Sequence, residues 1–242
     1  MINALFMVTS AIESRYGIYT PGQRLDQTLE TIQCLRDRVP GCVISLNEVS
    51  GNGLADQYAA RLEDAVDYYL DFTENSDVRY IYNKPEWVPN WDVVKNLTEL
   101  TTFPVSLKTL QEAGALEGID RVFKMSGRYL LNDKFDLSLY KHMDVVDRVV
   151  IGRDYPSQFP VQVTGLTHQY MCRLLSWPTA LHTDMIGWYE KGRDYMKQRM
   201  SVGGYADIEH CLYYALPRDQ VYQLDEVGVY GNIAPNGAPI IN

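Results

Sequence analysis

The feature that most constrains the fold is a strand–turn–helix order that occurs twice in the first 70 residues. The apolar, β-rich run 3–12 leads through a turn at 20–23 to helical apolar spacing over 24–38. The apolar run 42–49 leads through an S-G-N-G turn to a second helical pattern over 54–67. This order predicts a parallel sheet with right-handed crossovers, and therefore an α/β protein.

The rest of the chain continues this alternation without a linker or a composition shift. Further strands are expected at 68–72, 121–125, 145–152 and 161–164, and helices at 93–116 with a break near Phe103-Pro104, at 178–198 and at 208–216. The Pro-rich stretch 80–90 is expected to be irregular. The Gly- and Pro-rich tail from Gly228 is expected to lie over the body as a loop or to be partly loose. A chain of 242 residues with this pattern predicts one domain.

Composition and charge exclude several classes of function. Hydrophobic residues make up 46% of the chain and charged residues 22%, which is typical of a globular protein with a core. Acidic residues outnumber basic ones by 31 to 22, and the net charge of −9 argues against a broad nucleic-acid or anionic-membrane surface. The N-terminal apolar run is too short for a signal peptide or a membrane span. The four cysteines lack metal-site spacing and are expected to be buried free thiols, so we expect a cytoplasmic protein.

Polar residues follow three of the predicted strands. Ligands of open α/β sheets bind beyond the C-terminal ends of the parallel strands, so these positions are candidates for a site. They are Thr9, Ser10 and, after a loop, Arg24; Asn47, Glu48 and Ser50; and Lys124, Ser126, Gly127, Arg128 and Tyr129. Capping and turn chemistry can explain any one such group. Three groups on neighbouring strand ends favour a binding site.

The segment 123–136, FKMSGRYLLNDKFD, is the most informative of these. Lys124 and Arg128 bracket a Ser-Gly turn, in which Gly127 permits close approach to the backbone. Arg128 can bind a phosphate or carboxylate through two hydrogen bonds, and Tyr129 can cover a flat ring. The alternative is a structural hairpin in which Arg128 pairs with an acidic residue.

A second candidate segment is 203–216, GGYADIEHCLYYAL. Glu209 falls in the first turn of the predicted helix, where the amide groups and the helix dipole favour its charged form. Such a carboxylate can act as a general base, and His210 could hydrogen-bond a substrate hydroxyl. The alternative is plain capping of the helix by Asp207 and Glu209.

Several motifs are absent from the sequence. It has no Walker A loop, no G-x-G-x-x-G, no G-x-S-x-G, no H-E-x-x-H and no Asp-x-Asp, and its four histidines lack metal-ligand spacing. These absences argue against a P-loop nucleotide site, a dinucleotide-binding site, a serine hydrolase and a zinc protease.

Five segments together carry a resemblance to a known family. They are V-T-S-A-I, R-L-D-Q-T-L-E-T-I-Q-C-L-R, V-I-S-L-N-E-V-S, F-K-M-S-G-R-Y-L, and I-E-H with the later G-V-Y-G-N-I-A-P-N-G. With these, the chain resembles the little-characterised glycosyltransferase-like proteins of bacteria and large viruses, which are similar to GT-A enzymes of polysaccharide assembly. The resemblance covers about residues 3–238.

The resemblance implies a single GT-A-like domain with a mixed, mostly parallel sheet flanked by helices. About residues 1–130 would bind a UDP-, GDP- or dTDP-sugar, and about 131–242 would bind a carbohydrate or glycoconjugate acceptor. The activity implied is hexosyl or deoxyhexosyl transfer in a bacterial cytosol or that of a virus-infected host.

The resemblance also implies roles for the candidate residues. Thr9, Ser10 and Arg24 would line the nucleotide pocket, and Glu48 and Ser50 would contact base or ribose. Ser126, Gly127, Tyr129, Asp207 and His210 would contact the substrates.

The resemblance implies that catalysis depends on Glu209 and on cationic side chains. Glu209 falls where inverting GT-A enzymes often place their base. Many GT-A enzymes carry a DxD metal site where this chain has Ser126-Gly127-Arg128. We therefore expect no firm cofactor and a weak or absent dependence on a divalent cation (Mn²⁺ or Mg²⁺), with Lys124 and Arg128 as the candidates to offset the charge of the leaving diphosphate.

Two alternatives to an inverting, metal-independent glycosyltransferase remain open. A sugar nucleotidyltransferase needs a Gly-rich phosphate loop after the first strand and metal carboxylates, which T-S-A-I-E-S-R-Y-G matches poorly. A non-catalytic nucleotide- or sugar-binding protein would need neither.

Overall fold

A seven-stranded sheet forms the centre of the protein, which is described here as a computed structural model over residues 2–232 and 236–241. The strand order is β3-β2-β1-β4-β7-β6-β8. The strands are β1 (Ala4–Ser10), β2 (Val43–Glu48), β3 (Tyr68–Asp71), β4 (Arg121–Ser126), β6 (Val149–Pro156), β7 (His168–Pro178) and β8 (Val221–Leu224). Strands β1 to β4 are parallel, β6 and β8 are parallel, and β7 runs antiparallel to both of its neighbours. The predicted fold class, a mixed and mostly parallel sheet flanked by helices, is confirmed.

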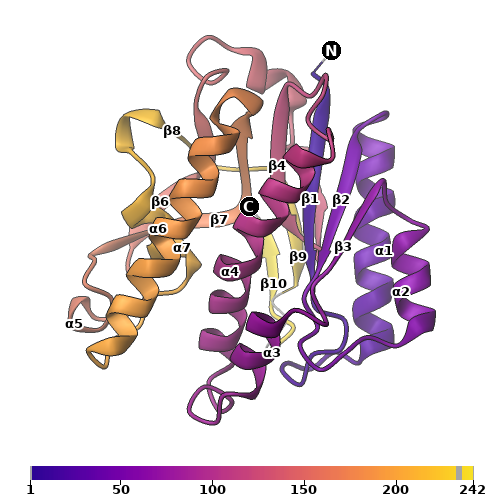
Figure 1. The fold of residues 1–242 in the computed structure, drawn as a ribbon. Helices are drawn as coiled ribbons and strands as arrows, with labels where there is room; N and C mark the ends of the chain where they lie inside the picture. Colours follow the sequence, from indigo (N-terminus) through magenta and orange to yellow (C-terminus); the bar gives the residue numbers. More distant parts are fainter. Residues whose placement is uncertain (1, 233–235, 242) are drawn as a thin grey trace.

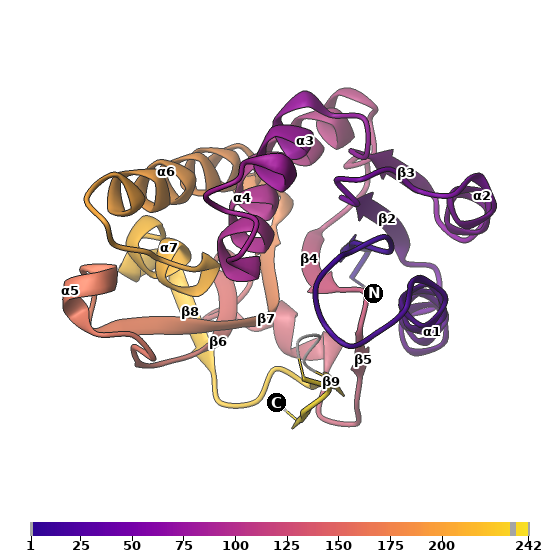
Figure 2. The same cartoon turned by 90° about the horizontal axis from the view of Figure 1, so that it is seen from below.

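Helices cover both faces of this sheet (Figures 1 and 2). They are α1 (Pro21–Arg38), α2 (Asp56–Glu63), α3 (Ser76–Asn83), α4 (Trp91–Glu112), α5 (Val161–Thr164), α6 (His182–Ser201) and α7 (Ile208–Ala215), with 3₁₀ turns at Leu137–Lys141, Thr179–Leu181 and Arg218–Gln220. Figure 2 shows α1 and α2 on one side of the strands and α4, α6 and α7 on the other.

Strand β1 shows why two layers form. Its side chains alternate, so Leu5 and Met7 join the core under α4 and α6, whereas Phe6 and Val8 join the core under α1. All four side chains are fully buried. A strand that is apolar on both faces can sit only in the middle of such a sandwich.

A second, smaller sheet contains β5, the strand that follows β4 in the chain. It has the order β10-β9-β5, from β5 (Tyr129–Leu131), β9 (Val229–Asn232) and β10 (Pro239–Ile241). Gly228 has a φ of +79°, and a Cβ there would lie 2.3 Å from the backbone nitrogen of Phe135. The tail expected to be a loop is therefore paired to β5 in its described part, while residues 233–235 and 242 of that prediction lie outside the described residues.

Two local predictions were wrong at helix boundaries. The expected turn at 20–23 is instead the start of α1, because Thr20 and Gln23 form a reciprocal capping box around Pro21. Helix α4 runs unbroken through Pro104. The neighbouring Phe103 and Leu107 are fully buried, and this packing offsets the roughly 3 kcal/mol cost of an internal proline.

Three further predictions were wrong about element type. Residues 161–164 form α5, which ends at Gly165 in the left-handed conformation (φ 77°), and not a strand. Part of the stretch 80–90 belongs to α3, which Asn75 caps. Strand β7 was missed, and the helix expected from residue 178 begins at His182 because β7 occupies the chain up to Pro178.

The state of the cysteines and the length and polarity of the helices were also predicted from the sequence. All four cysteines are free thiols, as expected; Cys42, Cys172 and Cys211 are buried, whereas Cys34 is only half-buried. Within residues 2–232 and 236–241, none of the helices has the length and apolar character needed to cross a bilayer.

Candidate active site

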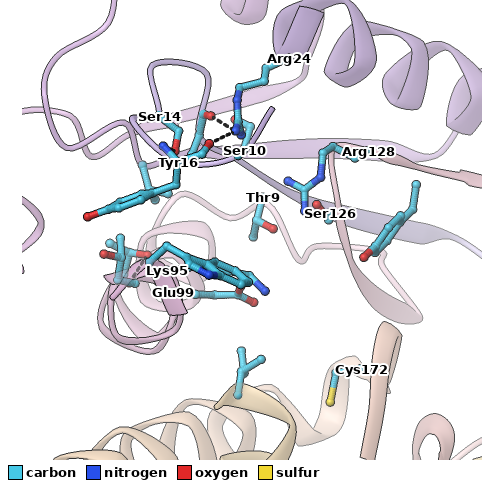
Figure 3. A pocket seen from close by; sticks show the side chains of 18 of the residues that line it. Thr9, Ser10, Ser14, Tyr16, Arg24, Lys95, Glu99, Ser126, Arg128 and Cys172 are labelled. Carbon is cyan, nitrogen blue, oxygen red and sulfur yellow. Dashed lines mark hydrogen bonds between the residues drawn. The ribbon is translucent and has the colours of Figure 1, made fainter. Parts of the chain in front are cut away.

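A cavity opens at the C-terminal ends of β1 and β4 (Figure 3). The register of the sheet creates it, because Thr9 of β1 lies beside Ser126 of β4. Its walls come from the loop after β1, helix α4, the β4–β5 turn and the start of α7. It is lined by eight of the predicted site residues: Thr9, Ser10, Arg24, Lys124, Ser126, Arg128, Tyr129 and Glu209. The other five, Glu48, Ser50, Gly127, Asp207 and His210, lie outside this lining.

Arg24 organises the loop that follows β1. Its Nε donates to the carbonyl of Tyr19 (3.2 Å), its Nη1 to that of Ala11 (3.4 Å), and its Nη2 to that of Tyr16. Figure 3 shows part of this set of bonds as dashed lines at Arg24. Burial, and then the positive charge of Arg128, lower the pKa of Arg24. Because all three guanidinium nitrogens of Arg24 donate to backbone carbonyls of the loop, Arg24 holds the loop that forms this wall of the cavity.

Glu48 lies in the interior, next to the same loop. Its fully buried carboxylate accepts hydrogen bonds from the hydroxyls of Ser10 and Ser50 and from the amides of Ile12 (3.1 Å) and Ser50 (2.9 Å). Burial raises the pKa of Glu48 against these four bonds. Glu48 and Ser50 therefore join the end of β2 to the start of the loop, and their expected contact with base or ribose has no support in this geometry.

The β4–β5 turn presents Arg128 to the cavity. The amide of Gly127 donates to Thr9 O (2.9 Å), and the Thr28 hydroxyl of α1 donates to Gly127 O (3.2 Å). A Cβ on Gly127 would lie 2.9 Å from Thr28 Oγ1, so the turn needs glycine to fit against α1.

The guanidinium of Arg128 lines the cavity. Within residues 2–232 and 236–241 it forms no hydrogen bond and no ion pair, and its Nε is buried without a partner. The alternative of a structural Arg128–carboxylate pair is not realised in that part of the chain. An unpaired buried donor costs free energy unless a ligand satisfies it, which marks Arg128 as an anion-binding group.

Helix α4 adds charged groups that sequence reasoning missed. Glu99 pairs with Lys124, and only 13% and 7% of these side chains are exposed. Lys95, one turn earlier on the same face, lines the cavity (Figure 3). The spacing of Lys95 and Glu99, which puts both on one face of the helix, was the available signal, but the pattern indicated only a core helix.

At the start of α7, Glu209 lines the cavity, whereas Asp207 and His210 lie outside its lining. Asp207 caps the helix by accepting from the His210 amide (3.0 Å), and it also contacts His210 Nδ1 (2.6 Å). The other ring nitrogen, Nε2, lies 2.8 Å from Ser157 Oγ. His210 is fully buried in this chain of contacts, so Asp207 and His210 hold the helix in place beside the site.

Glu209 has the properties of a proton acceptor. Burial, and then the carboxylate of Asp207, raise its pKa to about 7, while Lys95 acts in the opposite direction. The position of Glu209 at a helix terminus predicts a charged carboxylate, but the loss of hydration on burial outweighs that effect. A carboxylate that titrates near neutrality can take a proton from a substrate and later release it.

Comparison with known proteins bears on the fold. No protein-family model matches the chain, and no curated protein matches it in sequence. Its structure is similar to that of core-mannan synthase A from Aspergillus fumigatus in a Mn/GDP form, with a TM-score of 0.51, 10% identity and coverage of 96% of this chain and 75% of that one. It is also similar to a mannosyltransferase from S. cerevisiae, with a TM-score of 0.52, 12% identity and coverage of 91% and 68%. The chain has a GT-A-like fold.

The GT-A-like fold raises the question of a metal, because the Aspergillus structure is a Mn/GDP form. At the end of β4 this chain offers Ser126, Gly127 and the cation of Arg128, and Glu99 of the facing helix is paired with Lys124. Over residues 2–232 and 236–241 there is no group of three or more His, Cys, Asp or Glu side chains placed to hold a metal ion. These residues do not fit a divalent cation, which prefers several carboxylate or carbonyl oxygens.

Proposed function

We propose that this protein is a glycosyltransferase that moves a sugar from a nucleotide-sugar donor to a hydroxyl of a carbohydrate or glycoconjugate acceptor. The observation that carries the proposal is one cavity lined both by Arg128 and by the carboxylate of Glu209. The guanidinium of Arg128 has no partner within residues 2–232 and 236–241. A GT-A-like fold, and a cavity at the C-terminal ends of its parallel strands, support it.

The donor is a UDP-, GDP- or dTDP-sugar whose nucleotide lies against Thr9, Ser10 and the loop that Arg24 organises. The Tyr16 hydroxyl donates to Val88 O (3.0 Å), which fixes this loop against the chain before α4. The diphosphate lies at the β4–β5 turn. Arg128 stabilises the negative charge that develops there as the sugar leaves, in place of a metal ion.

The acceptor hydroxyl attacks the anomeric carbon from the face opposite the diphosphate. Glu209 takes the hydroxyl proton as the new carbon–oxygen bond forms. The bond from the anomeric carbon to the diphosphate oxygen breaks, and the nucleoside diphosphate leaves with its electron pair. Transfer therefore inverts the configuration of the sugar, and the acceptor is bound mainly by residues of the half 131–242.

Nucleotide-sugar binding and turnover test this proposal together. The protein is heated with a panel of UDP-, GDP- and dTDP-sugars in EDTA and in Mn²⁺, and release of nucleoside diphosphate is then measured with carbohydrate acceptors. We expect one nucleotide to stabilise the protein by several kcal/mol at saturation, with turnover in EDTA. No stabilisation by any nucleotide sugar would overturn the proposal.

Two other outcomes test the catalytic activity and the metal independence separately. Binding without turnover on any acceptor would favour a non-catalytic binding protein. Turnover that EDTA abolishes and Mn²⁺ restores would contradict the metal-independent mechanism.

A further inference from the structure

The charged residues that line the cavity are mainly cations. They are Arg24, Lys95, Glu99, Lys124, Arg128, Arg173 and Glu209. Five cations therefore stand against two carboxylates, in a chain whose net charge is −9. Positive charge gathered in one cavity of an acidic protein favours an anionic ligand.

Two of the five cations are already used by the protein. Lys124 forms a nearly buried ion pair with Glu99. Arg24 donates to three backbone carbonyls of the loop after β1. The cations that remain are Lys95, Arg128 and Arg173, and of these Arg173 comes from an element that was not predicted from the sequence, strand β7.

Strand β7 contains a β-bulge where it passes the cavity. On the side of β6, Ser176 pairs with Val150 and Met171 pairs with Gly152, so the four residues 172–175 lie opposite the single residue Ile151. A Cβ on Gly152 would lie 2.8 Å from the carbonyl oxygen of Met171, so glycine lets the two strands approach at the bulge. Bulges next to active sites commonly change the direction of a side chain.

The bulge brings Arg173 to the cavity. In a regular strand, residues two positions apart lie on the same face. Cys172, however, belongs to the core under α4 and α6, whereas Leu174 belongs to the core under α1. The alternation is interrupted between them, at Arg173, and this half-buried side chain lines the cavity.

Arg173 lies beside the end of β4. The antiparallel ladder of β4 and β7 runs as far as the pair Met125 and Leu174. The next position along this ladder places Arg173 beside Ser126, and Arg128 follows Ser126 after one glycine. Two arginines on neighbouring strands therefore line the cavity at the same strand end.

The two arginines also share the lack of a protein partner. Arg153, on the neighbouring strand β6, pairs with Asp225 (2.8 Å). Arg173 and Arg128 form neither a hydrogen bond nor an ion pair in the part of the chain that the structure describes, residues 2–232 and 236–241, and the Nε of Arg128 is buried. Guanidinium groups in such a cavity are satisfied when an anion binds.

We propose that Arg173 and Arg128 together bind the donor diphosphate, one from each of two neighbouring strands. Each guanidinium can donate two parallel hydrogen bonds to phosphate oxygens. The two fixed positive charges offset the negative charge that develops on the diphosphate as its bond to the sugar breaks. This inference rests on the proposed function for the identity of the donor, but the diphosphate site can be tested by itself.

The test is calorimetric titration of the whole protein with inorganic pyrophosphate in EDTA. We expect the unmodified protein to bind pyrophosphate. Arg173→Met should bind it at least about tenfold more weakly, because charge-assisted hydrogen bonds are lost, and Arg128→Met should show a loss of the same order. Arg173→Lys keeps the charge but cannot form two parallel hydrogen bonds, so its affinity should lie between those of Arg173→Met and the unmodified protein.

A matched control lies on β6, and melting temperatures without ligand show which variants are folded. Arg153 is paired with Asp225 outside the cavity, so Arg153→Met should bind pyrophosphate as the unmodified protein does. No binding of pyrophosphate, unchanged affinity in Arg173→Met, or an equal loss in Arg153→Met would overturn the two-arginine site. If Arg173→Met does not fold, unchanged affinity in Arg173→Lys would overturn it.

The failure of this site and the failure of the proposed function give different results. If pyrophosphate binding depends on both arginines but no nucleoside diphosphate binds, the proposed function fails and the two-arginine site stands. If a nucleoside diphosphate binds with the same affinity to Arg173→Met and to the unmodified protein, the two-arginine site fails and the proposed function stands.

Discussion

At the scale of single residues, the two cations of the segment 123–136 occupy different environments. Lys124 is paired with Glu99, whereas Arg128 lines the cavity and has no partner within residues 2–232 and 236–241. The sequence placed both at the end of one strand and could not separate them, because Glu99 is brought to Lys124 only by packing of a distant helix. Arg128 is therefore the group that we expect to act on the diphosphate.

Replacing Arg128 tests this role. Arg128→Ala should lower transfer by about 2–4 kcal/mol of transition-state stabilisation, the usual cost of losing a preorganised charge at a reacting centre. Steady-state kinetics at saturating donor measures it. Arg153→Ala is the control, because Arg153 is exposed and pairs with Asp225 away from the cavity. Equal kinetics in the two variants would remove Arg128 from the mechanism.

Glu209→Gln tests the base. The variant should bind nucleotide normally and lose roughly 10²–10⁴-fold in kcat, because its amide cannot take the acceptor proton. In the unmodified enzyme the base must be ionised, so kcat/KM should rise with pH through about 7. The apparent pKa of kcat should lie higher, since the bound diphosphate favours the protonated carboxyl. A flat pH profile, or near-normal turnover in Glu209→Gln, would exclude the base role.

The same group affects stability with a definite sign. The pKa of Glu209 is raised from 4.5 to about 7 in the folded protein, so the unfolded chain releases this proton at lower pH. The free energy of unfolding should therefore fall as pH rises from about 4.5 to 7, and Glu48, whose pKa is raised by burial, should act in the same direction. Denaturant titrations across this range should show a shallower fall in Glu209→Gln, and an unchanged slope would contradict the shift.

At the scale of elements, the loop after β1 depends on the side chain of Arg24. Arg24→Met should leave the carbonyls of Ala11, Tyr16 and Tyr19 without their donor. Because these bonds are only part-buried, each should cost less than the roughly 1–3 kcal/mol of a fully buried group left unsatisfied. Nucleotide affinity should fall together with the melting temperature. Full nucleotide affinity in a variant of lower melting temperature would show that the loop is not part of the nucleotide site.

Helix α7 depends on its cap in a comparable way. Asp207→Ala should destabilise the protein by at least about 0.5–2 kcal/mol, because it removes the cap and a partner of the buried His210. Asp184→Ala is the control, since Asp184 is exposed in the first turn of α6 and that helix has no side-chain cap bond. Similar unfolding free energies for the two variants would contradict the capping role.

Sequence patterns predicted the helices and strands that are determined by residues close to one another in the chain. The first two strands, their helices and α7 follow from apolar spacing, turn residues and caps that lie close in the sequence. Strand β7 was missed because Arg173 interrupts its apolar run, and its pairing with β4 joins residues about 50 positions apart. For the same reason, Glu209 and Arg128 could be predicted as candidates from the sequence, whereas Lys95 and Glu99, which reach the cavity through the packing of α4, could not.

At the scale of the whole molecule, the sheet order places these groups around one opening. Strands β1 and β4 are neighbours although more than 100 residues separate them, and α4 and α7 approach the same strand ends from one face (Figure 1). The loop after β1, the β4–β5 turn and the start of α7 therefore meet at a position that no single segment defines. This arrangement underlies the proposal that donor and acceptor react there.

A structure of the protein with a bound nucleoside diphosphate, UDP or GDP, tests that proposal most directly. We expect the nucleotide at the C-terminal ends of β1 and β4, with its diphosphate in contact with Arg128 and its nucleoside beside Thr9, Ser10 and the loop after β1. A nucleotide bound at the opposite edge of the sheet, or bound with Arg128 away from its phosphates, would contradict it.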